Sequence, residues 1–106
     1  MEIRFENKVA FITGAAGGIG YAAARMFAEA GASVVMADLD SRVTDRAKEL
    51  EAEGHNAIGI RCDVSDEAQV KAAVEKAVAV FGKLDIAYNN VGIHAAVRED
   101  LAETEG

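Results

Sequence analysis

The sequence predicts an α/β fold: a doubly wound parallel sheet, incomplete, with elements in the order βαβαβαβ. Three observations predict it. Short, continuous apolar runs alternate with longer stretches in which apolar residues recur at the period of a helix. A glycine follows each of the helix-like stretches. The chain has no proline and no low-complexity linker. Buried strands that alternate with amphipathic helices form a parallel sheet covered on both faces.

The first strand is expected over residues 9–12, because the run Val-Ala-Phe-Ile is typical of a strand buried on both faces. A helix should follow over residues 19–30, where apolar side chains recur three and four positions apart on one face. Gly31 is expected to end this helix. The second buried strand is predicted over residues 33–37, which read Ser-Val-Val-Met-Ala.

The second helix is more polar, and either Asp40 or Ser41 is a suitable N-cap for it. Gly54 should end it. A third strand is predicted over residues 57–62. The apolar residues that share one face of this helix are Val43, Ala47 and Leu50.

Ser65 is expected to cap the third helix, with Asp66 and Glu67 in its first turn, where the helix dipole favours acids. Gly82 should end it, and a fourth strand is predicted over residues 84–88. The remainder should be a loop and the start of another helix. The predicted buried stripe of the third helix consists of Val70, Ala73, Val74, Ala77 and Phe81.

The composition narrows the classes of function. The net charge is −7, and no basic run occurs, which argues against a nucleic-acid or anionic-membrane surface. The single cysteine, Cys62, excludes an internal disulfide and favours a reducing compartment. The first eight residues are too charged for a signal peptide, and no apolar stretch approaches membrane-spanning length. We therefore predict a cytoplasmic protein.

The run TGAAGGIG, residues 13–20, stands where the first strand passes into the first helix. Ligands of doubly wound sheets bind outside the carboxyl ends of the strands, and a helix N-terminus there suits a phosphate. Gly14 would make the turn, while Gly18 and Gly20 would let a diphosphate and the helix approach the backbone. A merely flexible turn is the alternative. A P-loop is excluded, because no Gly-Lys-Ser/Thr follows.

Asp38 ends the second predicted strand, 18 residues after Gly20. An acid at about this distance binds the adenosine ribose hydroxyls of a dinucleotide. The same carboxylate would repel a 2′-phosphate by roughly 4 kcal/mol per unit charge at 4 Å and an effective dielectric near 20. The next cation along the chain is Arg42, so NAD is favoured over NADP. The alternative is that Asp38 only caps a helix.

Four motifs together resemble the short-chain dehydrogenase/reductases: TGAAGGIG, Asp38, Cys62-Asp63-Val64 and Asn89-Asn90-Val91-Gly92. The resemblance extends from about Lys8 to Gly92. It has one small departure, Val91, where that family most often has alanine. It implies a Rossmann-type sheet, a nicotinamide dinucleotide and hydride transfer to or from a small-molecule alcohol or ketone. It also suggests a homo-oligomer, a dimer or a tetramer.

The resemblance assigns roles by position. The glycine run would hold the pyrophosphate, with help from the backbone N–H of Ile19. Asp38 would bind the ribose and Leu39 would line the adenine, which Asp63 and Val64 would also contact. Asn90 and Gly92 would border the ribose near the nicotinamide, while Asn89 ties strand ends together. Taken alone, Asp63 is as well explained as a cap or a solvated charge. The expected cofactor-binding residues are Thr13, Gly14, Gly17, Gly18, Ile19, Gly20, Asp38, Leu39, Asp63, Val64, Asn90 and Gly92.

The chain lacks the proton-transfer pair of that family, Tyr-x-x-x-Lys, because no lysine follows a tyrosine by four positions. The nearest imitation joins Tyr21 to Arg25, and arginine cannot give up a proton in a protein. No metal-ligand spacing surrounds His55. We therefore expect no catalytic residue and no metal site here. Residues 1–106 would be the N-terminal NAD-binding part of a single domain, inactive without its catalytic half. The alternative is a non-catalytic nucleotide-binding or interaction module, complete at this length.

Overall fold

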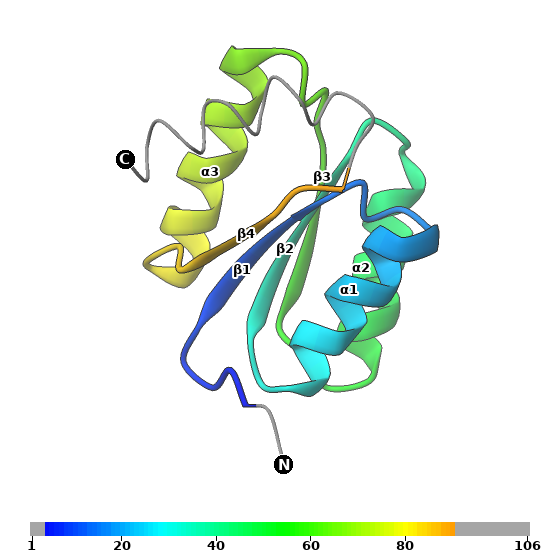
Figure 1. The fold of residues 1–106 in the computed structure, drawn as a ribbon, viewed down its shortest axis with the longest axis vertical. Coiled ribbons are helices and arrows are strands. Elements are labelled where there is room, and N and C mark those ends of the chain that lie inside the picture. Colours follow the sequence, from blue (N-terminus) through cyan, green and yellow to red (C-terminus); the bar gives the residue numbers. More distant parts are fainter. Residues whose placement is uncertain (1–3, 91–106) are drawn as a thin grey trace.

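The computed structural model of the protein describes residues 4–90, which form one parallel sheet with helices on both faces (Figure 1). The predicted α/β class is confirmed. The strands are β1 (Val9–Thr13), β2 (Ser33–Asp38), β3 (Ala57–Arg61) and β4 (Ile86–Tyr88). The helices are α1 (Gly18–Glu29), α2 (Arg42–Ala52) and α3 (Glu67–Phe81).

The strands lie in the order β3-β2-β1-β4, so β1 has a neighbour on each side. Thr13 is in register with Ala37 of β2, and Ile12 is in register with Tyr88 of β4. Because all the pairs are parallel, the carboxyl ends of these strands meet at one edge of the sheet. The loops that follow β1, β2 and β4 therefore begin close together.

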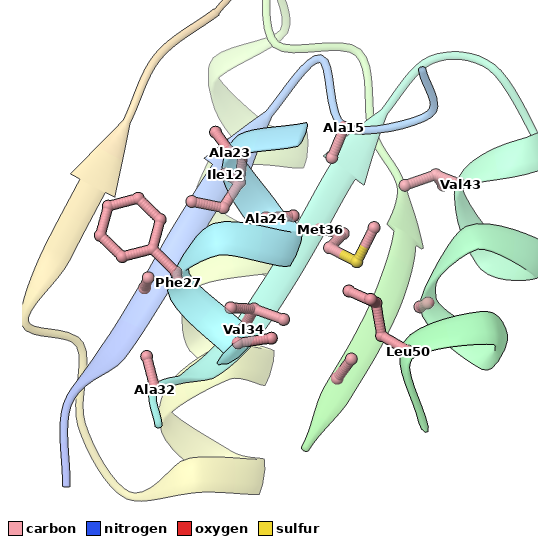
Figure 2. Packing of buried hydrophobic residues seen from close by; sticks show 14 of the residues in the cluster. Ile12, Ala15, Ala23, Ala24, Phe27, Ala32, Val34, Met36, Val43 and Leu50 are labelled. Carbon is pink, nitrogen blue, oxygen red and sulfur yellow. The ribbon is translucent and has the colours of Figure 1, made fainter. Parts of the chain in front are cut away.

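The alternation of side chains along β1 and β2 divides the core into two layers. Ile12 and Met36 face α1 and α2, where they pack with Phe27 and Leu50 (Figure 2). The intervening residues belong to the other face, which α3 covers (Figure 1), and they pack in a second cluster with Ala73 and Ala77 of that helix. Burying an aliphatic side chain of this size contributes about 1.5–3 kcal/mol. The residues of the α3-side layer are Val9, Phe11, Val35, Ala37, Cys62, Ala73 and Ala77.

The predicted helix ends are mostly correct. Gly31 and Gly82 follow α1 and α3 with left-handed φ angles of 102° and 86°. The predicted N-cap of α3 is wrong. Asp66, rather than Ser65, occupies it and accepts hydrogen bonds from the N–H groups of Ala68 and Gln69. The Ser65 hydroxyl donates instead to the Asp63 carboxylate at 2.6 Å, so it is not free to cap.

Strand β4 begins at Ile86, two residues later than predicted. The difference arises at Asp85, which bonds to β1 partly through its side chain. Its N–H donates to the Val9 carbonyl, and its carboxylate accepts the Val9 N–H, both at 2.9 Å. The carboxylate thus stands where a strand would offer a backbone carbonyl.

Within residues 4–90, none of the helices combines the length and the apolar character that crossing a bilayer requires.

Candidate functional site

The connection from β1 to α1 is shaped by glycine at its two ends. Gly14 follows β1 with φ 63°, and Gly18 opens α1 with φ 59°. Most L side chains are strained in this left-handed region, so the backbone favours glycine at both positions. The chain leaves the sheet, turns back over its carboxyl edge and enters the helix within residues 14–17.

Gly20 lets α1 pack directly on this turn. A Cβ built at Gly20 would lie 1.9 Å from the carbonyl oxygen of Gly14 and 3.1 Å from the side-chain nitrogen of Asn90. Any larger residue would push the helix away from the turn. A Cβ at Gly17, by contrast, would meet nothing within 4 Å. The glycine run therefore has one side packed against protein and one side open.

The N-terminus of α1 has no acidic partner of its own. Its N-cap, Gly17, makes no side-chain capping bond, and its first turn contains no acid. The other two described helices have an acid at their N-terminus. The Asp40 carboxylate accepts the N–H of Arg42 at the start of α2, and Asp66 caps α3. The N–H groups of a first helical turn have no intrahelical acceptor and carry a partial positive charge. The start of α1 can thus bind an anion.

Asp38 lies at the end of β2, next to the glycine run. One oxygen of its carboxylate accepts the N–H of Ala16, and the other accepts the N–H of Asp40, each at 2.9 Å. The N–H of Ala15 donates to the carbonyl of Ala37. A carboxylate has about four acceptor sites, so two bonds leave Asp38 able to accept more. The structure therefore brings together the loop and the acid that the sequence singled out.

Arg42, the first cation after Asp38, is itself paired. Its guanidinium donates to the Asp40 carboxylate at 2.7 Å and 2.9 Å. This bond holds the pKa of Asp40 below its usual value. The positive charge that follows Asp38 most closely in the sequence is therefore matched by Asp40.

The strand end of β4 is tied to that of β1 through Thr13. The Thr13 hydroxyl donates to the side-chain oxygen of Asn89 at 3.0 Å and accepts the N–H of Asn90 at 2.9 Å. Thr13 is only 9% exposed. The expected tie through Asn89 is therefore present, and Asn90 is held beside Gly20. Gly92 lies outside the described residues.

The remaining predicted residues lie around this centre. Ile19 and Leu39, both large and apolar, are 69% and 58% exposed. Asp63 and Val64 follow β3, which is separated from β1 by β2. Hydrogen bonds from Ser65 lower the pKa of Asp63. The structure thus keeps Asp63 and Val64 two strands away from the glycine run.

One contact to the loop was not predicted. Arg46 of α2 donates from Nε to the carbonyl oxygen of Ala16 at 3.0 Å, across thirty positions of sequence. In the sequence, Arg46 is only a charged residue on the polar face of a helix. Tyr21, rejected above as a catalytic group, bridges helices: its hydroxyl donates to Glu49 and accepts from Arg25. No group of three or more metal-ligating side chains occurs in the part of the chain that the structure describes.

Comparison with known proteins identifies this arrangement. Residues 8–105 match the family model described as short chain dehydrogenase. The chain is 47% identical over 89 residues to a cis-4-hydroxycyclohexanecarboxylate dehydrogenase of Sinomonas cyclohexanicum, covering 84% of this chain and 36% of that protein. It is 45% identical over 103 residues to a mitochondrial borneol dehydrogenase of Lavandula x intermedia, covering 96% of this chain and 38% of that one.

A solved structure of similar fold supports the same family. The crystal structure of a hydroxysteroid dehydrogenase from Escherichia coli superposes with a TM-score of 0.81 at 40% sequence identity, covering 84% of this chain and 38% of that one. The chain therefore spans little more than a third of the length of these relatives.

Proposed function

The chain belongs to the short-chain dehydrogenase family, and from that premise we propose that it is the NAD-binding part of an oxidoreductase acting on alcohols or carbonyls. One observation carries the proposal: the uncapped start of α1 is packed onto Gly14 by Gly20, beside the Asp38 carboxylate. A dinucleotide needs both features, an anion site for its diphosphate and an acceptor for its ribose hydroxyls.

The diphosphate would lie against the open side of the glycine run, at Gly17, Gly18 and Ile19. These residues offer backbone N–H groups at the positive end of the helix. Gly14 and Gly20 shape the loop. Thr13, at the end of β1, ties the start of the loop to Asn89 and Asn90, which follow β4. These residues would hold the amides in their binding positions before the ligand arrives, which reduces the conformational entropy lost on binding.

Asp38 would accept hydrogen bonds from the adenosine ribose, which supports NAD over NADP. A 2′-phosphate would stand against the carboxylate. Both nearby cations of α2 are already paired, Arg42 with Asp40 and Arg46 with Glu49. Leu39 would offer an apolar surface to the adenine. Asp63 and Val64 would bind the far edge of the same ring, which fits their position after β3.

Asn90 and Gly92 would border the nicotinamide ribose. When bound, the nicotinamide supplies the hydride chemistry; the residues of this chain position it. The sequence contains no Tyr-x-x-x-Lys pair, so we expect no proton donor and no turnover from these residues alone.

The family supports a proposal for the substrate class. Two relatives are named for hydroxylated compounds, a hydroxycyclohexanecarboxylate and a hydroxysteroid, which supports an alcohol or the corresponding carbonyl. We further propose a cytoplasmic homo-oligomer that uses neither nucleic acid nor a membrane, in keeping with the net charge of −7.

Titration calorimetry of the chain with NAD and with NADP tests the proposal. We expect NAD to bind at least tenfold more tightly than NADP, and neither to be turned over with an alcohol. A clear preference for NADP would contradict the cofactor assignment. Binding of neither nucleotide, by a chain that is folded by circular dichroism, would contradict the site itself.

A further inference from the structure

We propose that Arg46 is a positioning residue for the glycine run: it fixes the direction of the Gly17 N–H by holding the carbonyl oxygen of Ala16. This inference rests on the proposed function of the run as a diphosphate site. Its structural half, control of a peptide plane, can be measured without any ligand.

The geometry of the peptide bond links the two atoms. The carbonyl of Ala16 and the N–H of Gly17 belong to one planar unit, and no cis peptide occurs in the described chain. In a trans unit the C=O and the N–H point in opposite directions. Because Arg46 Nε holds the carbonyl oxygen at 3.0 Å from the side of α2, the Gly17 N–H must point away from α2.

The preceding peptide plane, between Ala15 and Ala16, is held by Asp38, whose charge is opposite to that of Arg46. The N–H of Ala16 donates to the Asp38 carboxylate at 2.9 Å. Ala16 is therefore held by an acid at its N–H and by a cation at its carbonyl, and its side chain is buried. Bonds to charged partners are roughly twice as strong as neutral ones.

The loop needs such a restraint because of its composition. Gly17 is in an extended conformation, φ −172° and ψ −179°, and is followed by Gly18 in the left-handed region. Glycines can reach many other backbone conformations at low cost. A peptide plane between Ala16 and two glycines would rotate readily if nothing outside the loop held it. The restraint is supplied by α2.

Arg46 is itself held in place by two partners. Its Nη1 donates to one oxygen of Glu49 at 2.8 Å, and its guanidinium carbon lies 5.4 Å from the centre of the Tyr21 ring. The Tyr21 hydroxyl donates to the other oxygen of Glu49 at 2.9 Å. Both bonds lower the pKa of Glu49, which keeps its charge at neutral pH. A planar guanidinium that stacks and donates from Nε as well as Nη1 suits this place better than an ammonium would.

The test uses Arg46→Met, which keeps length and apolar contact but loses every donor. Lys48→Met is the matched control, because Lys48 is exposed on the same helix and its loss removes the same charge. Arg46→Lys keeps the positive charge but lacks the planar set of guanidinium donors. The NMR order parameter of the Gly17 amide, without ligand, and the NAD affinity, by calorimetry, are measured for each variant.

We expect Arg46→Met to lower the order parameter of the Gly17 amide from the rigid-backbone value, about 0.85, towards about 0.6, and to weaken NAD binding three- to tenfold. Arg46→Lys should recover part of both losses, and Lys48→Met should show neither. Order parameters that fall uniformly over α1 and β2 would mean only a general loosening and would overturn the inference, as would an unchanged Gly17 amide. Loss of NAD binding in the wild-type chain would count against the proposed function alone, because the NMR result stands without it.

If Arg46→Met does not fold, Glu49→Gln replaces it. This change weakens the support of Arg46 without touching the loop, and it should lower the order parameter of the Gly17 amide by a smaller amount. A Glu49→Gln chain with the wild-type order parameter at Gly17 and wild-type NAD affinity would overturn the inference.

Discussion

The Asp38 carboxylate accepts the backbone N–H of Ala16 at 2.9 Å, across 22 positions of sequence. The acid proposed to bind the cofactor's ribose therefore also restrains the loop proposed to bind its diphosphate. A substitution at Asp38 should therefore disturb the binding of both the ribose and the diphosphate. It should lower NAD affinity more than the loss of a single ribose contact would.

Replacing Asp38 by alanine is expected to weaken NAD binding by tenfold or more, because charge-assisted hydrogen bonds contribute on the order of 1.5–3 kcal/mol. The preference for NAD over NADP should fall at the same time, since the repulsion of the 2′-phosphate is removed. Calorimetry with both nucleotides measures the two effects. Asp40→Ala is the control for NAD affinity alone, because that carboxylate bonds to Arg42 rather than to the loop, and its loss frees Arg42 to attract a 2′-phosphate. Unchanged NAD affinity in Asp38→Ala would remove Asp38 from the site.

The glycine run offers a pair of substitutions with opposite expectations. In Gly20→Ala the new methyl would stand 1.9 Å from the Gly14 carbonyl oxygen, so α1 must move. We expect a loss of about 1–3 kcal/mol in the free energy of unfolding, typical of overpacking. Urea denaturation followed by circular dichroism measures it.

Gly17→Ala is the matched variant, because its methyl meets nothing in the protein and its extended φ suits alanine. The free energy of unfolding should fall by at most about 1 kcal/mol, the cost of alanine at an N-cap. NAD affinity should nevertheless fall roughly tenfold, since the methyl enters the proposed diphosphate space. Wild-type NAD affinity in Gly17→Ala would place the diphosphate elsewhere.

Most of the fold could be predicted because its signals are local. Gly31 and Gly82 end helices through their own backbone conformations, and the apolar run of β1 is buried on both faces as expected. The cap of α3 could not be settled this way, since Ser65 and Asp66 both have capping side chains. The choice depends on Asp63, which accepts the Ser65 hydroxyl.

The site residues, too, could be predicted where their placement follows from local sequence or from the strand order, and not where it depends on packing. Asp38 could be predicted to lie near the glycine run, because parallel strands end at one edge of the sheet. Arg46 could not, because its contact with Ala16 depends on how α2 packs beside α1. The start of β4 depends likewise on a side chain of Asp85 taking the place of a backbone acceptor, which no periodicity reveals.

Thr13 should behave as a structural clamp between strand ends. Thr13→Val keeps the shape of the side chain but leaves the Asn90 N–H and the Asn89 side chain without the hydroxyl. We expect the free energy of unfolding to fall by about 1–3 kcal/mol, the cost of an unsatisfied buried group. Thr13→Ser keeps the hydroxyl and should lose much less. Equal urea midpoints for the valine and serine variants would show that the two bonds contribute little.

Asp85 predicts how stability depends on pH. The Val9 N–H, and after it Lys83, hold the pKa of Asp85 below its usual value. A carboxyl group whose pKa is lower in the folded state binds fewer protons there than in the unfolded chain. Its stabilisation is complete above the unfolded pKa, near 3.9, and is lost as the pH falls through the folded pKa. The effect should therefore be confined to the acid side of about pH 4.

Asp85→Asn removes the charge while keeping the size of the side chain, and urea midpoints from pH 7 to pH 2 compare it with the wild type. We expect the wild-type midpoint to be higher at neutral pH and the two curves to converge at the acid end. Lys83→Gln is the control: it removes the 3.2 Å ion pair with Asp85 and the bond from Lys83 to the Asn7 carbonyl, but it leaves the Val9 bond. Its difference from the wild type should therefore depend less on pH. A gap between Asp85→Asn and wild type that stays constant down to pH 2 would mean that the charge of Asp85 does not stabilise the β1–β4 junction, and that the asparagine acts through packing instead.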